Sequence, residues 1–202
     1  MGATITDIAK MKQSYQITVT QRIAEENGKT VSKKNTFTVF SEDFLTLGKC
    51  SVGDVLDDEG LALLQAAAKK RDACHTALRI LSHGDNSAAA LYRKLRVRDI
   101  SEADALFALR FVRGEGWLDE EKQLRATLPR LAEQKLLGPR RLLAACVQKG
   151  YRAETVRGVL HALVEEGTID FSSIKRLLFK KYHPASEEEW ALCLSKHGFS
   201  TD

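Results

Sequence analysis

The chain has 202 residues, of which 44% are hydrophobic and 29% are charged, and its formal net charge at pH 7 is +4. This composition is typical of a soluble globular chain of one or two domains, and it excludes wholesale disorder, collagen-like chains and low-complexity chains. No run of about 18 apolar residues is present, and residues 1–12 lack the pattern of a cleavable leader, so we expect a cytoplasmic protein without a membrane span or secretory signal.

The four cysteines, Cys50, Cys74, Cys146 and Cys193, are widely spaced and form no CxxC pair. We therefore expect free thiols in a reducing compartment. Cys193 and His197 lie four residues apart, as two ligands on one helix face would, but nothing nearby supplies the other two ligands that zinc needs. We expect both to pack, and we expect neither a metal nor a cofactor.

Basic residues concentrate in the middle of the chain. Residues 73–183 carry twenty Lys and Arg against thirteen Asp and Glu, whereas residues 1–72 carry ten of each and residues 184–202 carry one against four. The basic middle favours an anionic partner, either nucleic acid or an acidic protein surface. A solvated helical face rich in Lys and Arg explains the excess equally well.

The first sixty residues have the pattern of strands. β-branched or aromatic residues alternate with Gln and Thr in two runs, one around Ile17 and Val19 and the other around Phe37 and Val39. Asn27-Gly28 between the runs favours a tight turn. We predict a small antiparallel hairpin, with a third strand near Thr4–Ile8, followed by a short helix that Ser41 caps.

From Leu61 onward the apolar residues recur at helical spacing. Polar breaks separate the helices, and we expect capping side chains at Ser87, Ser101, Asp119 and Asp170. Pro129 lies inside the helical pattern from Glu120 to Leu137 and should kink or divide it. We expect Trp117 and Tyr151 to pack in the core, with stacking on a nucleic-acid base as the less favoured alternative.

The helical part aligns with itself at a shift of 51 residues without a gap. Glu115-Gly116 falls on Glu166-Gly167, and Leu118-Asp119 falls on Ile169-Asp170, which is more specific than a shared apolar stripe. A third copy reaches Asp202 where its last helix should begin. Either that copy packs without its last helix, or a partner covers it, or the chain was cut there.

We therefore predict a mostly α fold, in which tandem three-helix repeats form an elongated, curved array behind a small N-terminal β-hairpin segment. The predicted segments are a strand-rich region at 1–60, a helical connection at 61–72, repeats at 73–116 and 117–167, and an incomplete repeat at 168–202.

Several stretches of the helical part have a distinctive order and spacing. They are Ala77-Leu78-Arg79-Ile80-Leu81, Ser87 with Leu91 and Lys94-Leu95, Gly116-Trp117-Leu118-Asp119, Gly138-Pro139-Arg140-Arg141-Leu142 with Lys149-Gly150-Tyr151, and Lys196 to Phe199. Together they cover residues 73–202 and resemble the RecX family of bacterial recombination regulators. The sequence departs from the family pattern at Ala90, Cys146 and Thr168, which are packing changes, and in its short third unit, which in this family helps to bridge the partner.

The resemblance implies a protein without catalysis or cofactor. RecX proteins bind along the groove of the RecA filament on DNA and modulate it in recombination, DNA repair and the SOS response. They usually inhibit its ATPase, strand exchange and co-protease action. We therefore expect a monomer whose partners are the RecA filament and, weakly or within the filament, DNA, with no membrane partner. An extended array can contact successive subunits at once, so that weak contacts add.

The helical faces leave basic side chains pointing outward, and these are the candidate contacts to the partner or to nucleic acid. They are Arg93, Lys94, Arg96, Arg98, Arg140, Arg141, Lys149, Arg152, Lys175, Arg176, Lys180 and Lys181. Guanidinium forks suit phosphate or carboxylate oxygens. For any single residue, a solvated face held by salt bridges is an equally good explanation.

Two other classes of function compete with this reading. A stand-alone DNA-binding module ranks second, because breaks such as Asp99-Ile100-Ser101 resemble helix-turn-helix corners, although neither basic helix carries a dense set of residues for base edges. An enzyme ranks third, because the P-loop, nucleophile-elbow and zinc-protease motifs are all missing from the sequence. Gly114-Glu115-Gly116 follows a helix rather than a strand, unlike a dinucleotide-binding loop.

Overall fold

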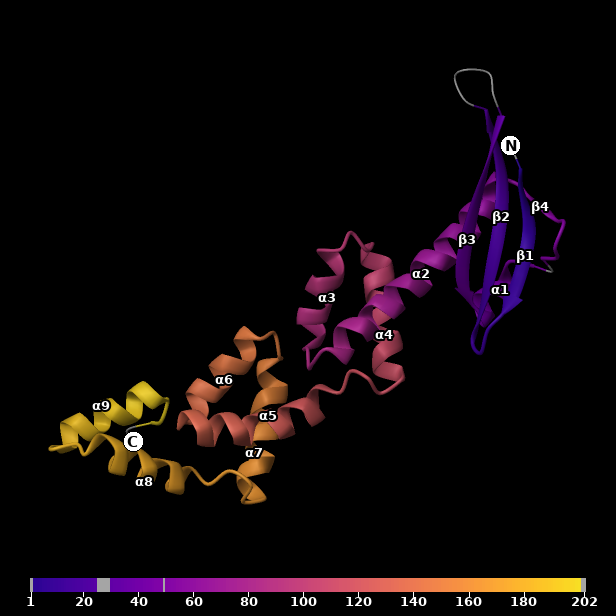
Figure 1. Cartoon of the computed structure of the whole chain (residues 1–202). Helices are drawn as coiled ribbons and strands as arrows, with labels where there is room; N and C mark the ends of the chain where they lie inside the picture. The colour runs from indigo at the N-terminus through magenta and orange to yellow at the C-terminus, as the bar shows by residue number, and fades with distance from the viewer. Residues whose placement is uncertain (1, 25–29, 49, 201–202) are drawn as a thin grey trace. The chain divides into compact units, whose positions relative to one another are not determined.

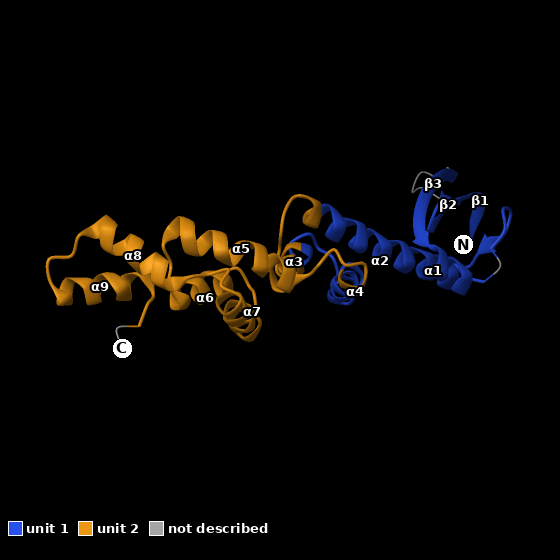
Figure 2. Ribbon diagram, turned by 90° about the horizontal axis from the view of Figure 1, so that it is seen from below, with its two compact units in different colours: residues 1–79, 95–112 blue, residues 80–94, 113–202 orange. Residues whose placement is uncertain are grey.

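The computed structural model describes residues 2–24, 30–48 and 50–200. Its contacts divide the chain into two compact units, drawn in two colours in Figure 2. Unit 1 comprises residues 1–79 and 95–112, and unit 2 comprises residues 80–94 and 113–202. Four strands, all in unit 1, and nine helices occur in the described residues (Figure 1).

The strands of unit 1 form one antiparallel sheet. They are β1 (Ala3–Lys10), β2 (Ser14–Ala24), β3 (Thr30–Phe40) and β4 (Val55–Leu56), in the order β3-β2-β1-β4. β2 pairs with β3 from Ser14↔Phe40 to Ala24↔Thr30. The predicted hairpin is therefore confirmed, and the predicted third strand is confirmed as part of β1. The Asn27-Gly28 turn lies outside the described residues.

The alternating pattern of these strands produces a core on one face of the sheet. Ile17, Val19 and Val39 are almost completely buried, and they belong to one cluster with Leu61 and Leu64 of α2 (Asp58–Ser82). The apolar face of the sheet is thus covered by the first turns of this long helix.

The short helix after β3 is α1 (Ser41–Thr46), as predicted in position. Its N-cap is Phe40, and no side chain caps it, so the prediction that Ser41 caps this helix is wrong. Ser41 is already the first helical residue, because β3 continues through Phe40 without a break. The ring of Phe44 stacks on Tyr15 of β2 at 4.1 Å between centroids, and this contact fixes α1 on the sheet.

The remaining helices follow at the expected places. They are α3 (Ala88–Arg96), α4 (Glu102–Gly114), α5 (Glu120–Lys135), α6 (Pro139–Gln148), α7 (Ala153–Glu165), α8 (Phe171–Tyr182) and α9 (Glu187–His197). α2 continues through the predicted junction at residues 72 and 73 as a single helix of 25 residues. The grouping of the helices into three-helix repeats stays a prediction. No helix in the described part of the chain is long and apolar enough to cross a membrane.

Four of the predicted caps are confirmed by hydrogen bonds from backbone amides. Asp119 accepts from Lys122 at 2.9 Å and Asp170 accepts from Ser172 at 2.8 Å. The hydroxyl of Ser87 accepts from the amide of Ala90, and that of Ser101 accepts from Asp104, both at 3.1 Å. Each satisfies an amide that the first turn of its helix leaves without a partner.

Pro129 does not divide its helix, so that part of the prediction is wrong. α5 runs through Pro129 from Glu120 to Lys135. Leu124 and Leu128 on one side of the proline and Ala132 on the other are all fully buried in the core of unit 2. Packing on both sides therefore holds the helix together despite the hydrogen bond that proline cannot donate.

The two aromatic residues expected in the core differ in how far they are buried. Tyr151 is 8% exposed, as predicted, whereas Trp117 is 56% exposed. The prediction for Trp117 is wrong because its neighbour Leu118, 3% exposed, occupies the core position directly before the cap Asp119.

Candidate partner-binding surface

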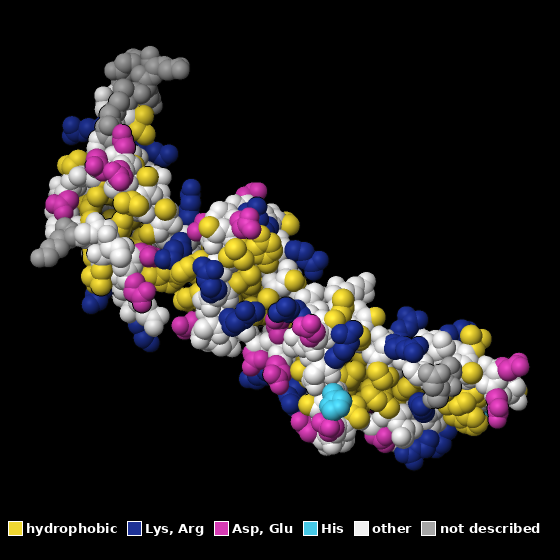
Figure 3. Space-filling view, turned by 180° about the vertical axis from the view of Figure 1, so that it is seen from behind, with side chains coloured by type: hydrophobic (Ala, Val, Ile, Leu, Met, Phe, Trp, Pro, Cys, Tyr) yellow, Lys and Arg dark blue, Asp and Glu magenta, His cyan; other side chains and the backbone are white. Residues whose placement is uncertain are grey.

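The predicted basic residues lie on the surface, as the helical spacing requires. Eleven of the twelve are exposed, and Lys175 is partly buried. The residues expected to face inward do so, since Leu91, Leu95, Leu142 and Cys146 are all fully buried. On the face drawn in Figure 3, Lys and Arg side chains are interspersed with Asp and Glu, so the basic excess forms no single large patch there.

The first basic group of unit 2 surrounds the start of α3. The hydroxyl of Ser87 donates to the carbonyl of Lys149 at 2.8 Å. The Lys94 ammonium donates to the side-chain oxygen of Asn86 at 2.5 Å. The corner between α6 and α7, which carries Lys149 and Arg152, therefore rests on the first turn of α3.

Gly150 permits this contact. Its φ is +93°, and a Cβ at this position would lie 2.7 Å from the Ser87 hydroxyl oxygen and 3.3 Å from the Ala89 methyl. Glycine has no Cβ, so it adopts this left-handed conformation and approaches Ser87 and Ala89 this closely without strain.

Tyr151, the next residue, fixes the corner to α5. Its buried hydroxyl donates to the Gln123 side-chain oxygen at 2.9 Å. Burial, and secondarily the negative charge of Asp85, raise the pKa of Tyr151 to about 12. The hydroxyl is thus neutral and a donor at physiological pH, and the corner is held in one position.

The second basic group of unit 2 surrounds the end of α9. The amide of Gly138 donates to the His197 carbonyl at 2.7 Å, and the amide of Arg140 donates to the Gly198 carbonyl at 3.1 Å. The guanidinium Nε of Arg141 donates to the Lys196 carbonyl at 3.1 Å. The first turn of α6 is therefore capped by carbonyls from the end of α9.

Lys175 and Lys196 belong to this second group. The Lys175 ammonium lies 5.5 Å from the centre of the Phe199 ring, next to the Gly198 corner. The candidate residues did not include Lys196. The mirrored stretches Cys146–Tyr151 and Leu194–Phe199 were the signal that could have found it, because they mark this corner as the counterpart of the one at Gly150.

The two groups share one construction. In each, a glycine with positive φ, Gly150 or Gly198, follows a helix and packs on the first turn of another helix, α3 or α6. In each, basic residues stand in the first turn or at the corner that packs on it. The side chains of Arg140, Lys149 and Arg152 form no ion pair with the described residues, and their charge is therefore available to a partner.

Not all predicted residues join these groups. Arg96 and Arg98 belong to unit 1, where the guanidinium of Arg96 donates to the Ile100 carbonyl at 2.7 Å. Arg93 is exposed on α3. Lys180 and Lys181 lie exposed in the last turn of α8, where cations complement the helix dipole, and Lys181 lies 5.4 Å from the Tyr182 ring centre.

Some of the basic side chains form ion pairs with nearby carboxylates. Arg176 donates to the Ser173 hydroxyl at 2.8 Å and lies 3.8 Å from the Asp170 carboxylate. The hydrogen bond from Ser173, with other contacts that include Arg176, lowers the pKa of Asp170. Arg125 donates to both carboxylate oxygens of Glu166 at 3.0 Å, and these bonds raise its pKa. Arg176 and Arg125 therefore share their charge with neighbouring carboxylates.

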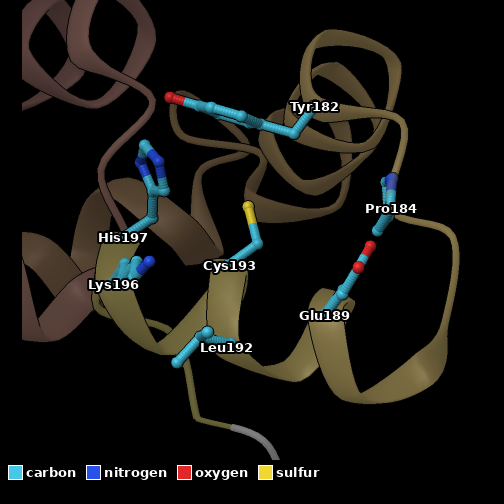
Figure 4. A pocket seen from close by; sticks show the side chains of 7 residues that line it. All are labelled: Tyr182, Pro184, Glu189, Leu192, Cys193, Lys196 and His197. Atoms are coloured by element: carbon cyan, nitrogen blue, oxygen red, sulfur yellow. The ribbon is translucent and has the colours of Figure 1, made fainter.

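Cys193 and His197 lie in a cavity of about 300 Å³ between α8 and α9, together with Tyr182 and Glu189 (Figure 4). His197 Nδ1 lies 3.0 Å from the Leu136 carbonyl, a contact that joins α9 to the loop before α6. The described residues contain no group of three or more His, Cys, Asp or Glu that could hold a metal ion. All four cysteines are free thiols.

No protein-family model matches the sequence, and no curated protein matches it. Solved structures match the fold, among them two of RecX proteins. A crystal structure of regulatory protein RecX aligns with 98% of this chain and 95% of its own, with a TM-score of 0.71 and 21% identity. The chain has the RecX fold. RecX from Lactobacillus salivarius aligns with 66% of this chain and 90% of its own, with a TM-score of 0.57 and 16% identity. The resemblance to RecX seen in the helical motifs is thus confirmed at the level of the fold.

Proposed function

We propose that this chain is a regulator of the RecX type that binds along the groove of the RecA filament on DNA and inhibits its ATPase, strand exchange and co-protease activity. The observation that carries the proposal is the pair of basic groups at the Gly150 and Gly198 corners of a chain with the RecX fold. These groups include Arg140, Lys149 and Arg152, which form no ion pair with the described part of the chain. Hydrogen bonds fix the backbone that carries them.

Such groups suit a repetitive, anionic partner. A single exposed ion pair contributes only about 0–1 kcal/mol, so one group binds weakly. Two groups on one unit raise the effective concentration of the second contact once the first has formed. Fixed backbone lowers the entropy cost of binding at each group. In this proposal the chain acts in the cytoplasm as a monomer without a cofactor, and DNA is contacted weakly or within the filament.

The test is the ATPase activity of RecA on single-stranded DNA, titrated with this chain at fixed, moderate salt. The test variant replaces Arg140, Arg141, Lys149 and Arg152 with Ala. The control variant replaces Lys122, Arg130, Lys135 and Arg157 with Ala, which removes the same charge from exposed positions outside both groups. Circular dichroism melting of each variant verifies folding.

We expect the wild-type chain and the control variant to inhibit at or below one chain per few RecA subunits, and the test variant to require a much higher concentration. Equal inhibition by both variants would show that the basic groups do not bind the filament. Absence of inhibition by the wild-type chain would contradict the proposal itself.

The second candidate is a stand-alone DNA-binding module, because the same exposed cations, Arg140, Lys149 and Arg152, suit duplex phosphates. It predicts binding to duplex DNA that exceeds binding to the RecA filament and falls steeply with salt. A salt slope near zero would exclude it.

A further inference from the structure

A cleft in unit 1 lies outside both basic groups. It has a volume of about 290 Å³ and is formed by the β1–β2 turn, the end of β3, α2 and α4. Its lining includes Lys12, Gln13, Phe40, Arg71, His75 and Phe111. All of these residues belong to unit 1, so the cleft is complete within one compact body.

The cleft carries two cations. Lys12 and Arg71 line it together with His75, and none of its lining residues is acidic. The nearest carboxylate to the Arg71 guanidinium among the described ion pairs is that of Asp72, at 3.5 Å and with 70% of its side chain exposed. Arg71 therefore keeps N–H donors for an anion. Lys70, by contrast, is engaged with Asp43 at 2.7 Å.

The cleft also has an aromatic wall. The rings of Phe40 and Phe111 lie 5.4 Å apart between centroids and are tilted by 39°. Leu78 adds apolar surface. Arg71, His75 and Leu78 lie at positions i, i+4 and i+7 of α2, so one helix face presents both the cationic and the apolar part. A planar ring that carries an anionic group matches this combination.

We propose that the cleft binds one nucleotide, with the base against Phe40 and Phe111 and the phosphate at Arg71, assisted by Lys12 and His75. The volume lies at the lower end of ligand sites, which suits a single nucleotide or one residue of a longer strand. The same chemistry occurs in a free nucleotide and in a residue of a single-stranded nucleic acid. The proposal does not depend on RecA, because the basic groups tested above are in unit 2.

The experiment measures binding by isothermal titration calorimetry of the full chain with deoxyadenosine monophosphate, a ten-residue oligodeoxyadenylate and inorganic phosphate. The variants are Arg71→Gln and Phe111→Leu, and the control is Lys69→Gln, an exposed cation of α2 that does not line the cleft. We expect saturable binding of the mononucleotide, weakened roughly tenfold or more by Arg71→Gln and several-fold by Phe111→Leu, with little change for Lys69→Gln.

The three ligands distinguish a site for free nucleotide from a contact for single-stranded nucleic acid. Oligonucleotide binding that the mononucleotide displaces and that Arg71→Gln weakens supports the site as a contact for single strands. Mononucleotide binding alone supports a site for free nucleotide. Phosphate binding as tight as that of the mononucleotide would overturn the proposal, and so would nucleotide binding that neither cleft variant changes.

A second measurement covers the case in which a variant does not fold. In NMR spectra of the wild-type chain, addition of the mononucleotide should shift the backbone amides of Gln13, His75 and Phe111. Shifts confined to unit 2, or no shifts, would overturn the proposal.

Discussion

The hydroxyl of Ser87 donates to the carbonyl of Lys149 at 2.8 Å, across 62 residues of sequence. The same oxygen accepts from the Ala90 amide at 3.1 Å and so caps α3. One small side chain thereby starts a helix and fixes the basic corner that follows another. The stability of unit 2 and the geometry of the first basic group therefore depend on the same residue.

Replacing Ser87 with Ala removes both bonds at a position that is 1% exposed. Loss of the cap costs about 1 kcal/mol, and the Lys149 carbonyl loses a donor in addition. We expect the free energy of unfolding to fall by about 2 kcal/mol in urea titrations. The control is Ser195→Ala on the exposed side of α9, which should change it by less than about 0.5 kcal/mol. Equal stability of the two variants would contradict the dual role of Ser87.

The corner glycines differ from other glycines with positive φ in what surrounds them. A Cβ on Gly198 would lie 2.6 Å from the Arg141 backbone nitrogen, and one on Gly150 would lie 2.7 Å from the Ser87 hydroxyl oxygen. Gly167, with φ of +73°, has open space around it. Substitutions at these three positions therefore distinguish the cost of the left-handed backbone from the cost of a steric clash.

We expect Gly167→Ala to lower the free energy of unfolding by about 1–2 kcal/mol through its left-handed conformation alone. Gly150→Ala should cost more, and Gly198→Ala should cost most, because its neighbour is backbone that cannot rotate away. Urea unfolding of the three variants measures the order. A cost at Gly198 no greater than at Gly167 would show that the α6–α9 contact yields easily.

Local features of this fold can be predicted from the sequence, whereas contacts between distant residues cannot. Helix starts at Ser87 and Asp119 and outward positions on α3 and α6 follow from local spacing, so they were predicted correctly. The exposure of Trp117 does not follow from local spacing. Trp117 and Leu118 are adjacent apolar residues, and only the fold decides which of the two is buried. The long-range bonds that gather the basic residues, such as that from Arg141 to Lys196, connect positions whose proximity no local pattern encodes.

The buried hydroxyl of Tyr151 gives a prediction for high pH. Its pKa is raised from 10.0 to about 12, mainly by burial, and the neutral form is therefore favoured in the folded chain. The unfolded chain loses this proton first as the pH rises, so the contribution of Tyr151 to stability is complete below pH 10 and is lost between about pH 10 and 12. The absorbance of tyrosinate, compared between the wild-type chain and Tyr151→Phe, should show a step with a midpoint near pH 12. A step near pH 10 in the folded chain would contradict the burial of this hydroxyl.

Asp99 occupies the position 51 residues before Gly150, and its φ of +58° is also left-handed. A side chain in this conformation is strained by about 1–2 kcal/mol, less for Asp than for most residues, and glycine relieves the strain at some cost in chain entropy. Asp99→Gly should therefore raise the free energy of unfolding by about 0.5 kcal/mol, whereas Asp99→Ala should lower it by about 1 kcal/mol. Urea unfolding of both variants checks the signs, and stabilisation by alanine would show that the corner at Asp99 relaxes out of the left-handed region. The opposite signs expected for glycine and alanine mean that the test reports backbone conformation at this corner rather than loss of the carboxylate, which both variants share.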